Sequence, residues 1–452
     1  MNDPIDFIHG LNFAQLPPEV VHQARRCLLD LVGVAVSGRQ TELSHIAHDF
    51  AVDHLGAGRK GARLLFDGRR ASAAGAAFAG ATTIDSFDAH DGHALTKGHA
   101  GVAILPALLA VADAEGLLEG GSLDGEALLT RLVLGYEIAT RAGIALHASA
   151  CDYHTSGAWN ALGCAAVAAR LLGLDRERSR HALGIAEYHG PRSQMMRCID
   201  HPTMVKDGSG WGALAGTSAA YLAKDGFTGA PAITLEAPEQ AAIWADLGER
   251  WLVLDQYFKP WPVCRWAQPA IEAASLLLSE HGLAAADIER VEVETFHEAV
   301  RLGAQRPATT EAAQYAIGFP LAAFIVRGRL GAGEIGTDGL CDSAIADMLR
   351  RVRLIESPEF SRRFPAERLA RLRLVLKSGQ VAASEATAAR GDRGHPLSDA
   401  DMLSKFRYSA AVLGNERGTA LGNNCMKLPR GSNIETICAS LFAPVGTYAE
   451  CF

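Results

Sequence analysis

The sequence lacks any cysteine pair with the CxxC spacing that is typical of zinc sites and thiol redox sites. Its nine cysteines are scattered along the chain, which does not indicate a disulfide framework, so we expect reduced thiols and a cytoplasmic location. It also lacks a basic start followed by an apolar run, and every apolar stretch is too short to span a membrane. These absences predict a soluble protein with no membrane partner.

Positively charged residues are fewer than negatively charged ones. The chain has 43 Lys and Arg residues against 51 Asp and Glu residues, a net charge of −8, which argues against a nucleic-acid partner. Hydrophobic residues make up 48% of its 452 residues, as in ordinary packed proteins, and this length suits two domains. Because the overall charge is negative, an anionic substrate requires a local cluster of cations.

The first part of the chain, residues 1–265, predicts a helical domain. Apolar residues recur at three- and four-residue spacing between positions 20 and 35, directly after Pro17 and Pro18, and proline is favoured where a helix begins. Helices are also expected in the Ala- and Gly-rich or apolar segments 71–81, 101–112, 125–145, 157–172 and 211–222. Few period-two alternations interrupt this part of the chain.

The pattern changes after Tyr257. The two prolines of the segment 258–262 favour extended backbone at the residues before them. Alternation of apolar and polar residues then predicts strands in 290–296, 351–355 and 371–381, the last reaching a Ser-Gly turn signal, between helices at 267–281, 312–326 and 343–349. We therefore predict a mostly α fold in which residues 266–400 form a smaller α+β domain and residues 401–452 return to the helical domain.

The strongest local anomaly is the segment from Asp85 to Gly101, which holds three histidines, three aspartates and a lysine between two apolar helices. Histidine exchanges protons near neutral pH, and a neighbouring carboxylate tunes it, so this loop is a candidate acid–base site. Its candidate residues are Asp88, His90, Asp91, His93, Lys97 and His99. A solvated surface loop is the plain alternative. A metal site is less favoured, because no HExxH or CxxC pattern completes a ligand set.

Three other segments carry candidate residues. His154 precedes an apolar helix that Thr155 or Ser156 could cap, which would place the histidine near an anion-binding helix end. Lys206 precedes a Gly-Ser-Gly run and a helix start, and Lys259 and Arg265 flank the domain boundary, where two cations suit a carboxylate. Each has a surface alternative. No P-loop, Rossmann or pyridoxal-lysine motif is present, so we expect no cofactor and no metal.

In their order and spacing these segments resemble the MmgE/PrpD family nearly end to end. The resemblance rests on Leu16–Val20 with Leu29–Ala35, the acidic loop closing on His99 with Ile104–Ala110, His154–Gly157 with Leu171–Asp175, Lys206 ahead of Gly226–Gly229, and Phe258–Arg265. It implies a large all-helical domain formed by both chain ends, an inserted α+β domain, a homodimer, and a cofactor-free site between the domains.

By position, the resemblance carries the family's active-site residues to Asp88, His99, His154, Lys206 and Lys259. Members act on small di- and tricarboxylates, as 2-methylcitrate dehydratase, cis-aconitate decarboxylase and iminodisuccinate epimerase. Each reaction develops charge beside a carboxylate, and therefore needs a proton-transfer group at carbon and cations over the oxygens.

Departures from the family pattern help to choose among these reactions. An Asp-Asp-Thr style run is replaced by residues 88–92, a usual tyrosine by Phe319, and a usual histidine by Gln268. The loss of a phenol and a histidine weakens the dehydratase and decarboxylase interpretations. The extra Lys97 and the Lys-Gly-His-Ala-Gly run favour the epimerase branch.

We therefore expect an epimerase or racemase of a small amino- or imino-dicarboxylate, which removes a proton beside a carboxylate and returns one on the opposite face. The expected bases are His99, His154 or Lys97, with Asp88 orienting a histidine. The expected substrate-binding residues are Lys206, Lys259, Arg265, His90 and Asp91. A dehydratase-like hydro-lyase, a cis-aconitate decarboxylase-like lyase and a non-catalytic dicarboxylate binder remain as alternatives.

Overall fold

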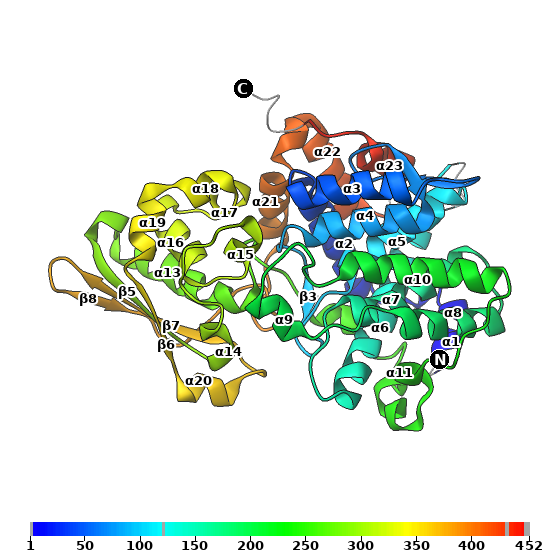
Figure 1. The fold of residues 1–452 in the computed structure, drawn as a ribbon, viewed down its shortest axis with the longest axis horizontal. Helices are drawn as coiled ribbons and strands as arrows, with labels where there is room; N and C mark the ends of the chain where they lie inside the picture. The colour runs from blue at the N-terminus through cyan, green and yellow to red at the C-terminus, as the bar shows by residue number, and fades with distance from the viewer. Residues whose placement is uncertain (1–2, 120–122, 430–433, 447–452) are drawn as a thin grey trace.

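The computed structural model describes residues 3–119, 123–429 and 434–446. Most of the helical part is a stack of long helices, which lie side by side in Figure 1. They are α2 (Pro18–Gly38), α3 (Glu42–His54), α4 (Ala73–Asp85), α5 (Gly101–Ala114), α6 (Gly125–Ser149), α7 (Gly157–Leu171), α8 (Arg176–His189) and α10 (Ser209–Lys224). Shorter helices are α1 (Pro4–Gly10), α9 (Met195–Asp200), α11 (Ile233–Glu236) and α12 (Ala241–Trp244). Every helix expected from the spacing in this part of the chain is present.

Small residues let these helices approach closely. Helix α10 packs on α7, α4, α8 and α5. A Cβ atom at Gly216 of α10 would lie 2.1 Å from the carbonyl oxygen of Ala161 in α7, and one at Gly212 would lie 2.7 Å from that of Gly157. The Ala- and Gly-rich composition therefore fixes the spacing of the stack, and with it the loops at the helix ends.

The second unit is an α+β arrangement around one sheet, at the left of Figure 1. Its strands are β5 (Ile288–Thr295), β6 (Val352–Glu356), β7 (Leu369–Leu376), β8 (Val381–Ala383) and β9 (Thr387–Ala388). Their order is β6-β5-β7-β8, with β9 also on β7; β5 and β6 are parallel and the other pairs antiparallel. The helices of this unit are α13 (Gln268–His281), α14 (His297–Val300), α15 (Thr310–Gln314), α16 (Gly318–Arg327), α17 (Ala332–Ile335), α18 (Thr337–Cys341), α19 (Ser343–Leu349) and α20 (Pro358–Arg363).

Two predicted elements of this unit are divided. The strand expected at 371–381 is a hairpin, because Gly379 has a φ of +86° and turns the chain between β7 and β8. The helix expected at 312–326 is split into α15 and α16. Pro320 then lies in the first turn of α16, where its missing N–H costs no hydrogen bond; inside a continuous helix it would break one. The break leaves Gln314 and Tyr315 at a helix end.

The last part of the chain packs against the first. Helices α21 (Asp399–Ser409) and α22 (Gly414–Lys427) contact α2, and α23 (Ile434–Phe442) follows them. The hydroxyl of Ser37 donates to the carbonyl of Ser409 at 2.8 Å, and Phe406 packs against Gly33. Figure 1 shows these orange and red helices beside the blue ones. Positions 430–433 and 447–452 of the predicted return lie outside the described residues, and the boundaries at 265 and 400 stay predictions.

Two further short ladders are β1 (Gly61–Arg63) with β2 (Arg70–Ser72), and β3 (Gly92–His93) with β4 (Gln256–Tyr257). The second ladder joins the histidine-rich loop to the segment that leads into Lys259, so it brings two predicted site segments together. None of the described helices combines the length and the apolar composition that a bilayer crossing needs.

Candidate active site

A small cavity of about 30 Å³ lies where the helical part meets the α+β unit. The helical part contributes Asp88, Lys97, His99, Met195, Ile199 and Asp207. The segment between the two units contributes Tyr257, Lys259, Cys264, Arg265 and Trp266, and the α+β unit contributes Tyr315 and Arg368. Five residues predicted from the sequence therefore line one cavity: Asp88, Lys97, His99, Lys259 and Arg265.

Asp88 and Lys259 form a buried ion pair in this cavity. The Nζ of Lys259 donates to Oδ1 of Asp88 at 2.5 Å and lies 3.3 Å from the Asp88 carbonyl oxygen. Burial alone would raise the pKa of Asp88, but the charges of Lys259 and Lys206 outweigh it and hold this pKa well below its usual value. Burial opposes the charge of Lys259 as well, yet Asp88 leaves the lysine pKa raised. Both groups therefore stay charged.

His99 is held in one tautomer by the backbone. Its Nδ1 lies 2.6 Å from the carbonyl oxygen of Asp91, and because a carbonyl only accepts, Nδ1 carries the hydrogen. The other ring nitrogen, Nε2, therefore has an unprotonated lone pair, and it lies 3.8 Å from Oδ2 of Asp207. Burial and the charges of His90 and Lys259 lower the pKa of His99 to about 3. The residue is a neutral imidazole with its free lone pair at Nε2, and so low a pKa makes it a weak base.

His90 and Asp91 are not among the residues that line the cavity, and their predicted substrate-binding role stays a prediction. The His90 ring packs edge-on against His99 at 4.3 Å between centroids, and its Nε2 is 3.6 Å from Oδ1 of Asp85. The Asp91 carboxyl accepts a 2.9 Å hydrogen bond from Tyr136, and burial raises its pKa to about 8. Both side chains are thus in contact with neighbouring protein groups.

Lys97 and His154 are placed differently. Lys97 lines the cavity in the left-handed region, with a φ of 49°, and its Nζ lies 3.6 Å from the ring centre of Tyr153. His154 does not line the cavity; its ring stacks on His147 at 6.5 Å, and its Nδ1 is 3.7 Å from Oδ1 of Asp152. The structure thus brings Lys97, and not His154, to the cavity with His99.

Ser156 has a different role from the predicted helix cap. It occupies the N-cap position of α7, but its hydroxyl makes no capping bond. The hydroxyl instead donates to Oδ2 of Asp207 at 2.8 Å and accepts from the backbone N–H of His99 at 3.0 Å. Ser156 therefore ties the start of α7 to both sides of the cavity.

Lys206 and Arg265 are both bound to protein groups. The Nζ of Lys206 donates to the side-chain oxygen of Gln314 at 2.9 Å, and Lys206 does not line the cavity. Arg265 lines it, but its guanidinium pairs with Asp392 at 2.7 Å and donates to two backbone carbonyls. These contacts weaken the assignment of either cation as a direct ligand of a carboxylate.

Sequence reasoning missed several cavity residues. Asp207 follows Lys206 directly, and Tyr257 precedes the Lys-Pro-Trp-Pro segment, so proximity to a recognised motif was a usable signal for both. Tyr315 lies within the 312–326 segment, which was assigned as an unbroken helix. Arg368 is one of several arginines near a strand, and no sequence pattern separates it from the others.

Phenylalanine at position 319 does not leave the cavity without a phenol. Phe319 is a buried residue of α16. The side-chain amide of Gln268 donates hydrogen bonds to the carbonyls of Trp261 and Val263. The cavity nevertheless keeps two phenols, Tyr257 and Tyr315. Absence of a phenol at position 319 therefore does not weigh against dehydratase or decarboxylase chemistry.

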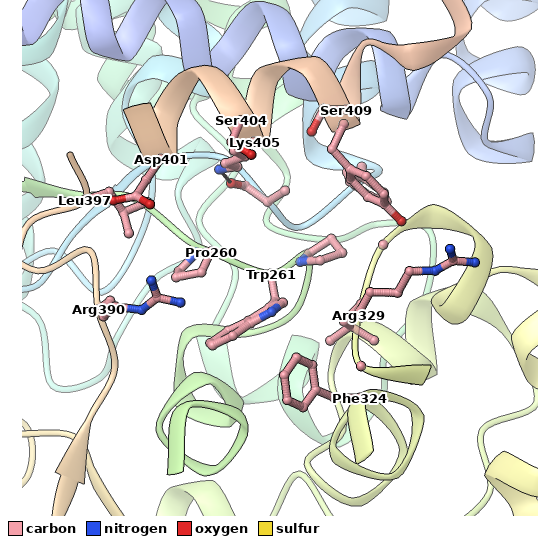
Figure 2. A pocket seen from close by; sticks show the side chains of 17 residues that line it. Pro260, Trp261, Phe324, Arg329, Arg390, Leu397, Asp401, Ser404, Lys405 and Ser409 are labelled. Carbon is pink, nitrogen blue, oxygen red and sulfur yellow. Dashed lines mark hydrogen bonds between the residues drawn. The ribbon is translucent and has the colours of Figure 1, made fainter. Parts of the chain in front are cut away.

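Two larger pockets lie at the same junction, and the cations of one are already paired with carboxylates. One of about 330 Å³ lies on the other side of the Lys259 segment, where Lys405 of α21 faces Pro260 and Trp261 (Figure 2). Its cations are already paired: Lys405 with Asp30, Arg329 with Glu334 and Arg390 with Glu272. Another of about 620 Å³ reaches Gln314 from the opposite side. Among the described residues, no three His, Cys, Asp or Glu side chains are grouped to hold a metal ion.

Comparisons with known proteins agree with the two-part architecture. The model of the MmgE/PrpD N-terminal domain matches residues 5–244, and that of the MmgE/PrpD C-terminal domain matches residues 261–427. Cis-aconitate decarboxylase of Homo sapiens is 25% identical over 437 residues, covering 90% of this chain and 86% of the relative. The enzyme of the same name from Mus musculus is 26% identical over 438 residues, with the same coverage. A cis-aconitate decarboxylase-like protein, oryM, of Aspergillus oryzae is 21% identical over 484 residues, covering 96% and 95%. The chain belongs to the MmgE/PrpD family.

Proposed function

We propose that this chain is a cofactor-independent enzyme that removes a proton from the carbon beside a carboxylate of a small di- or tricarboxylate. The observation that carries the proposal is the 2.6 Å contact between Nδ1 of His99 and the Asp91 carbonyl, which leaves Nε2 of a neutral imidazole as a base in the cavity. Two of the named relatives are cis-aconitate decarboxylases, and the third is named a cis-aconitate decarboxylase-like protein. A small carboxylate substrate fits both observations.

Because a neutral imidazole lines the cavity, we assign a reaction that begins with a base, namely epimerisation or racemisation of an amino- or imino-dicarboxylate. His99 removes the α-proton, and the charge that develops on the carboxylate is stabilised by nearby cations. A second group in the same cavity must then return a proton to the opposite face. Lys97 and Tyr257 both line the cavity and carry protons to give. Burial and the charge of Arg368 lower the pKa of Lys97 to about 8, so the ammonium form still predominates at neutral pH.

Decarboxylation of a cis-aconitate-like tricarboxylate is the second candidate, and the names of the relatives favour it. That reaction starts with loss of carbon dioxide and then needs an acid to protonate the carbon. The phenols of Tyr257 and Tyr315 meet this need, because burial raises the pKa of both and keeps them protonated.

One experiment separates these reactions. The enzyme is incubated in deuterated water with single stereoisomers of amino- and imino-dicarboxylates, and separately with cis-aconitate. Deuterium at the α-carbon together with loss of optical rotation supports the assigned reaction. Carbon dioxide from cis-aconitate without α-exchange supports the second candidate, and an ultraviolet-absorbing alkene indicates a hydro-lyase. Binding without any of these changes would refute the proposal, and His99→Gln serves as the inactive reference.

A further inference from the structure

We infer that Arg368 and Lys97 form a subsite that binds a second carboxylate of the substrate, apart from the ion pair of Lys259 and Asp88. This inference deepens the proposed function, because it makes two separated carboxylates the feature that the enzyme selects. It also gives Lys97 a binding role in addition to any role in proton transfer.

The guanidinium of Arg368 and the backbone of Lys97 contact the same carbonyl group. The Nη2 of Arg368 donates to the carbonyl of Ala94 at 3.2 Å, and the backbone N–H of Lys97 donates to the same carbonyl at 3.3 Å. The Arg368 guanidinium also lies 5.9 Å from the ring centre of Tyr257. Both side chains line the cavity that contains His99. A ligand that contacts them is therefore in the same space as the base.

Charge balance distinguishes this pair from the other cavity cations. Lys259 is neutralised by Asp88 at 2.5 Å, and Arg265 by Asp392 at 2.7 Å. Neither Lys97 nor Arg368 forms an ion pair with any residue in the described part of the chain, and the buried Nε of Arg368 has no hydrogen-bond partner there. Both side chains are partly buried, and a partly desolvated charge without a counter-charge is unfavourable, so an anion that contacts both would be stabilised here.

The pKa shifts have the direction expected for such a pair. Burial and, as the smaller cause, the charge of Arg368 together lower the pKa of Lys97 to about 8. Burial and the charge of Arg265 lower the pKa of Arg368. A bound carboxylate would reverse these effects, and a guanidinium with open N–H groups is well shaped for one.

The local backbone also holds Lys97 in place. Its left-handed conformation, with a φ of 49°, is unusual for lysine and is kept by the turn that follows β3, where His93 pairs with Gly98. The contact of Nζ with the Tyr153 ring fixes the side chain at the cavity. The ammonium is thus pre-positioned before a ligand arrives.

Calorimetric binding of unreactive probes tests the subsite without relying on turnover. The probes are succinate and tricarballylate, with two and three carboxylates, and propionate, with one. Arg368→Gln should weaken succinate binding about 10- to 100-fold, the range expected for losing hydrogen bonds to a charged group, and should leave propionate binding within about twofold. Arg368→Lys should recover part of the loss. Arg373→Gln, an exposed arginine on β7, the strand that begins directly after Arg368, is the matched control and should bind all probes as wild type does.

The outcomes for this subsite and for the proposed reaction are separable. Equal weakening of succinate and propionate, unchanged succinate binding in Arg368→Gln, or no binding of succinate and tricarballylate to the folded wild type would each overturn the subsite. Selective dicarboxylate binding without any α-proton exchange would leave the subsite standing and refute the proposed function. Thermal melting of each variant shows that the compared proteins are folded.

Discussion

At the scale of single residues, the position of one proton on His99 limits the reactions open to the cavity. The Asp91 carbonyl accepts a hydrogen bond from Nδ1 of His99, and the Ser156 hydroxyl accepts one from the backbone N–H of His99. His90 and Lys259 both disfavour a second proton on the ring. The result is a base that stays neutral over the whole range in which an ordinary histidine titrates.

The pH dependence of catalysis follows from this setting. The base form of His99 exists above its pKa of about 3, so it is lost only when the pH falls towards that value. We expect kcat/KM to show no fall between pH 7 and pH 5 that is due to His99, whereas a base with a pKa near 6.5 would lose more than tenfold there. Steady-state kinetics across this range, with thermal melting at each pH, makes the measurement.

The matched variants are His99→Gln and His93→Gln, which replace buried histidines of one loop. Loss of the base should lower kcat by about 10²- to 10⁴-fold, while the His93 variant, whose side chain does not line the cavity, should retain activity close to wild type. A fall in kcat/KM centred near pH 6.5, or similar losses in both variants, would contradict the assignment of His99.

Residue-scale prediction from the sequence succeeded where a side chain lies in a recognised segment. Asp88, His99 and Lys259 belong to such segments, and all three reach the cavity. The sequence did not predict the direction in which each side chain of the loop points. Asp91, in the loop that carries His99, is turned inward and accepts a hydrogen bond from Tyr136. Arg368 lies directly before β7, more than 250 positions later in the chain, and only the tertiary fold shows that it joins this loop.

At the scale of elements, the short helix α15 links Lys206 to the loop of residues 86–100, which we propose to be the catalytic loop. The side-chain oxygen of Gln314, at its end, accepts from the backbone N–H of Asp88 at 2.8 Å and from Nζ of Lys206 at 2.9 Å. Its amide nitrogen donates to the carbonyl of Ser86 at 3.2 Å. The periodic spacing of apolar residues predicted most helices and strands. It did not predict the break between α15 and α16, near Pro320, that places Gln314 at a helix end.

Replacing this amide should disturb the loop more than the helix. We expect Gln314→Leu to lower kcat about tenfold or more, because Asp88 and Lys206 lose a shared partner, and to reduce the unfolding free energy by about 1–3 kcal/mol, the cost of unsatisfied buried polar groups. Kinetics and urea denaturation measure the two effects. Gln305→Leu, at a nearby exposed position, is the control and should change neither. Unchanged kcat in Gln314→Leu would show that the loop is held without α15.

At the scale of the whole molecule, the cavity is lined by residues from distant parts of one chain, from Asp88 to Arg368. Hydrophobic patterning predicted two architectural units and the return, while their mutual placement depends on contacts between residues hundreds of positions apart, which periodicity does not reveal. The homodimer, the cytoplasmic location and the domain boundaries stay predictions. The return has a direct connection to the site through Lys405 of α21.

Lys405 links this last part of the chain to the catalytic loop. Its Nζ lies 2.6 Å from Oδ1 of Asp30 in α2 and 2.6 Å from the carbonyl oxygen of Ala89, next to Asp88. Figure 2 shows the lysine reaching from α21 over the segment of Pro260 and Trp261. One buried ammonium therefore ties both ends of the chain to the loop that pairs with Lys259.

A double-mutant cycle tests whether this tie positions the loop or only stabilises the fold. Lys405→Met leaves the Asp30 carboxylate buried and unpaired, which should cost about 3–5 kcal/mol of unfolding free energy. Burial raises the pKa of Asp30, and loss of the lysine raises it further. A carboxyl group whose pKa is higher in the folded state than in the unfolded state holds its proton more tightly in the folded state. The unfolding free energy therefore falls as the pH rises through these pKa values, and the deficit of the variant should be smaller at pH 5 than at pH 8.

The double variant Asp30→Asn with Lys405→Met removes the buried charge together with its partner. It should recover most of the stability, yet kcat should stay about tenfold or more below wild type, because the Ala89 carbonyl still lacks its ammonium partner. Urea denaturation and steady-state kinetics on all four proteins supply the two readouts. If kcat returns together with stability, the tie is structural alone. If kcat stays low in a protein of restored stability, the returning helix controls the position of the catalytic loop.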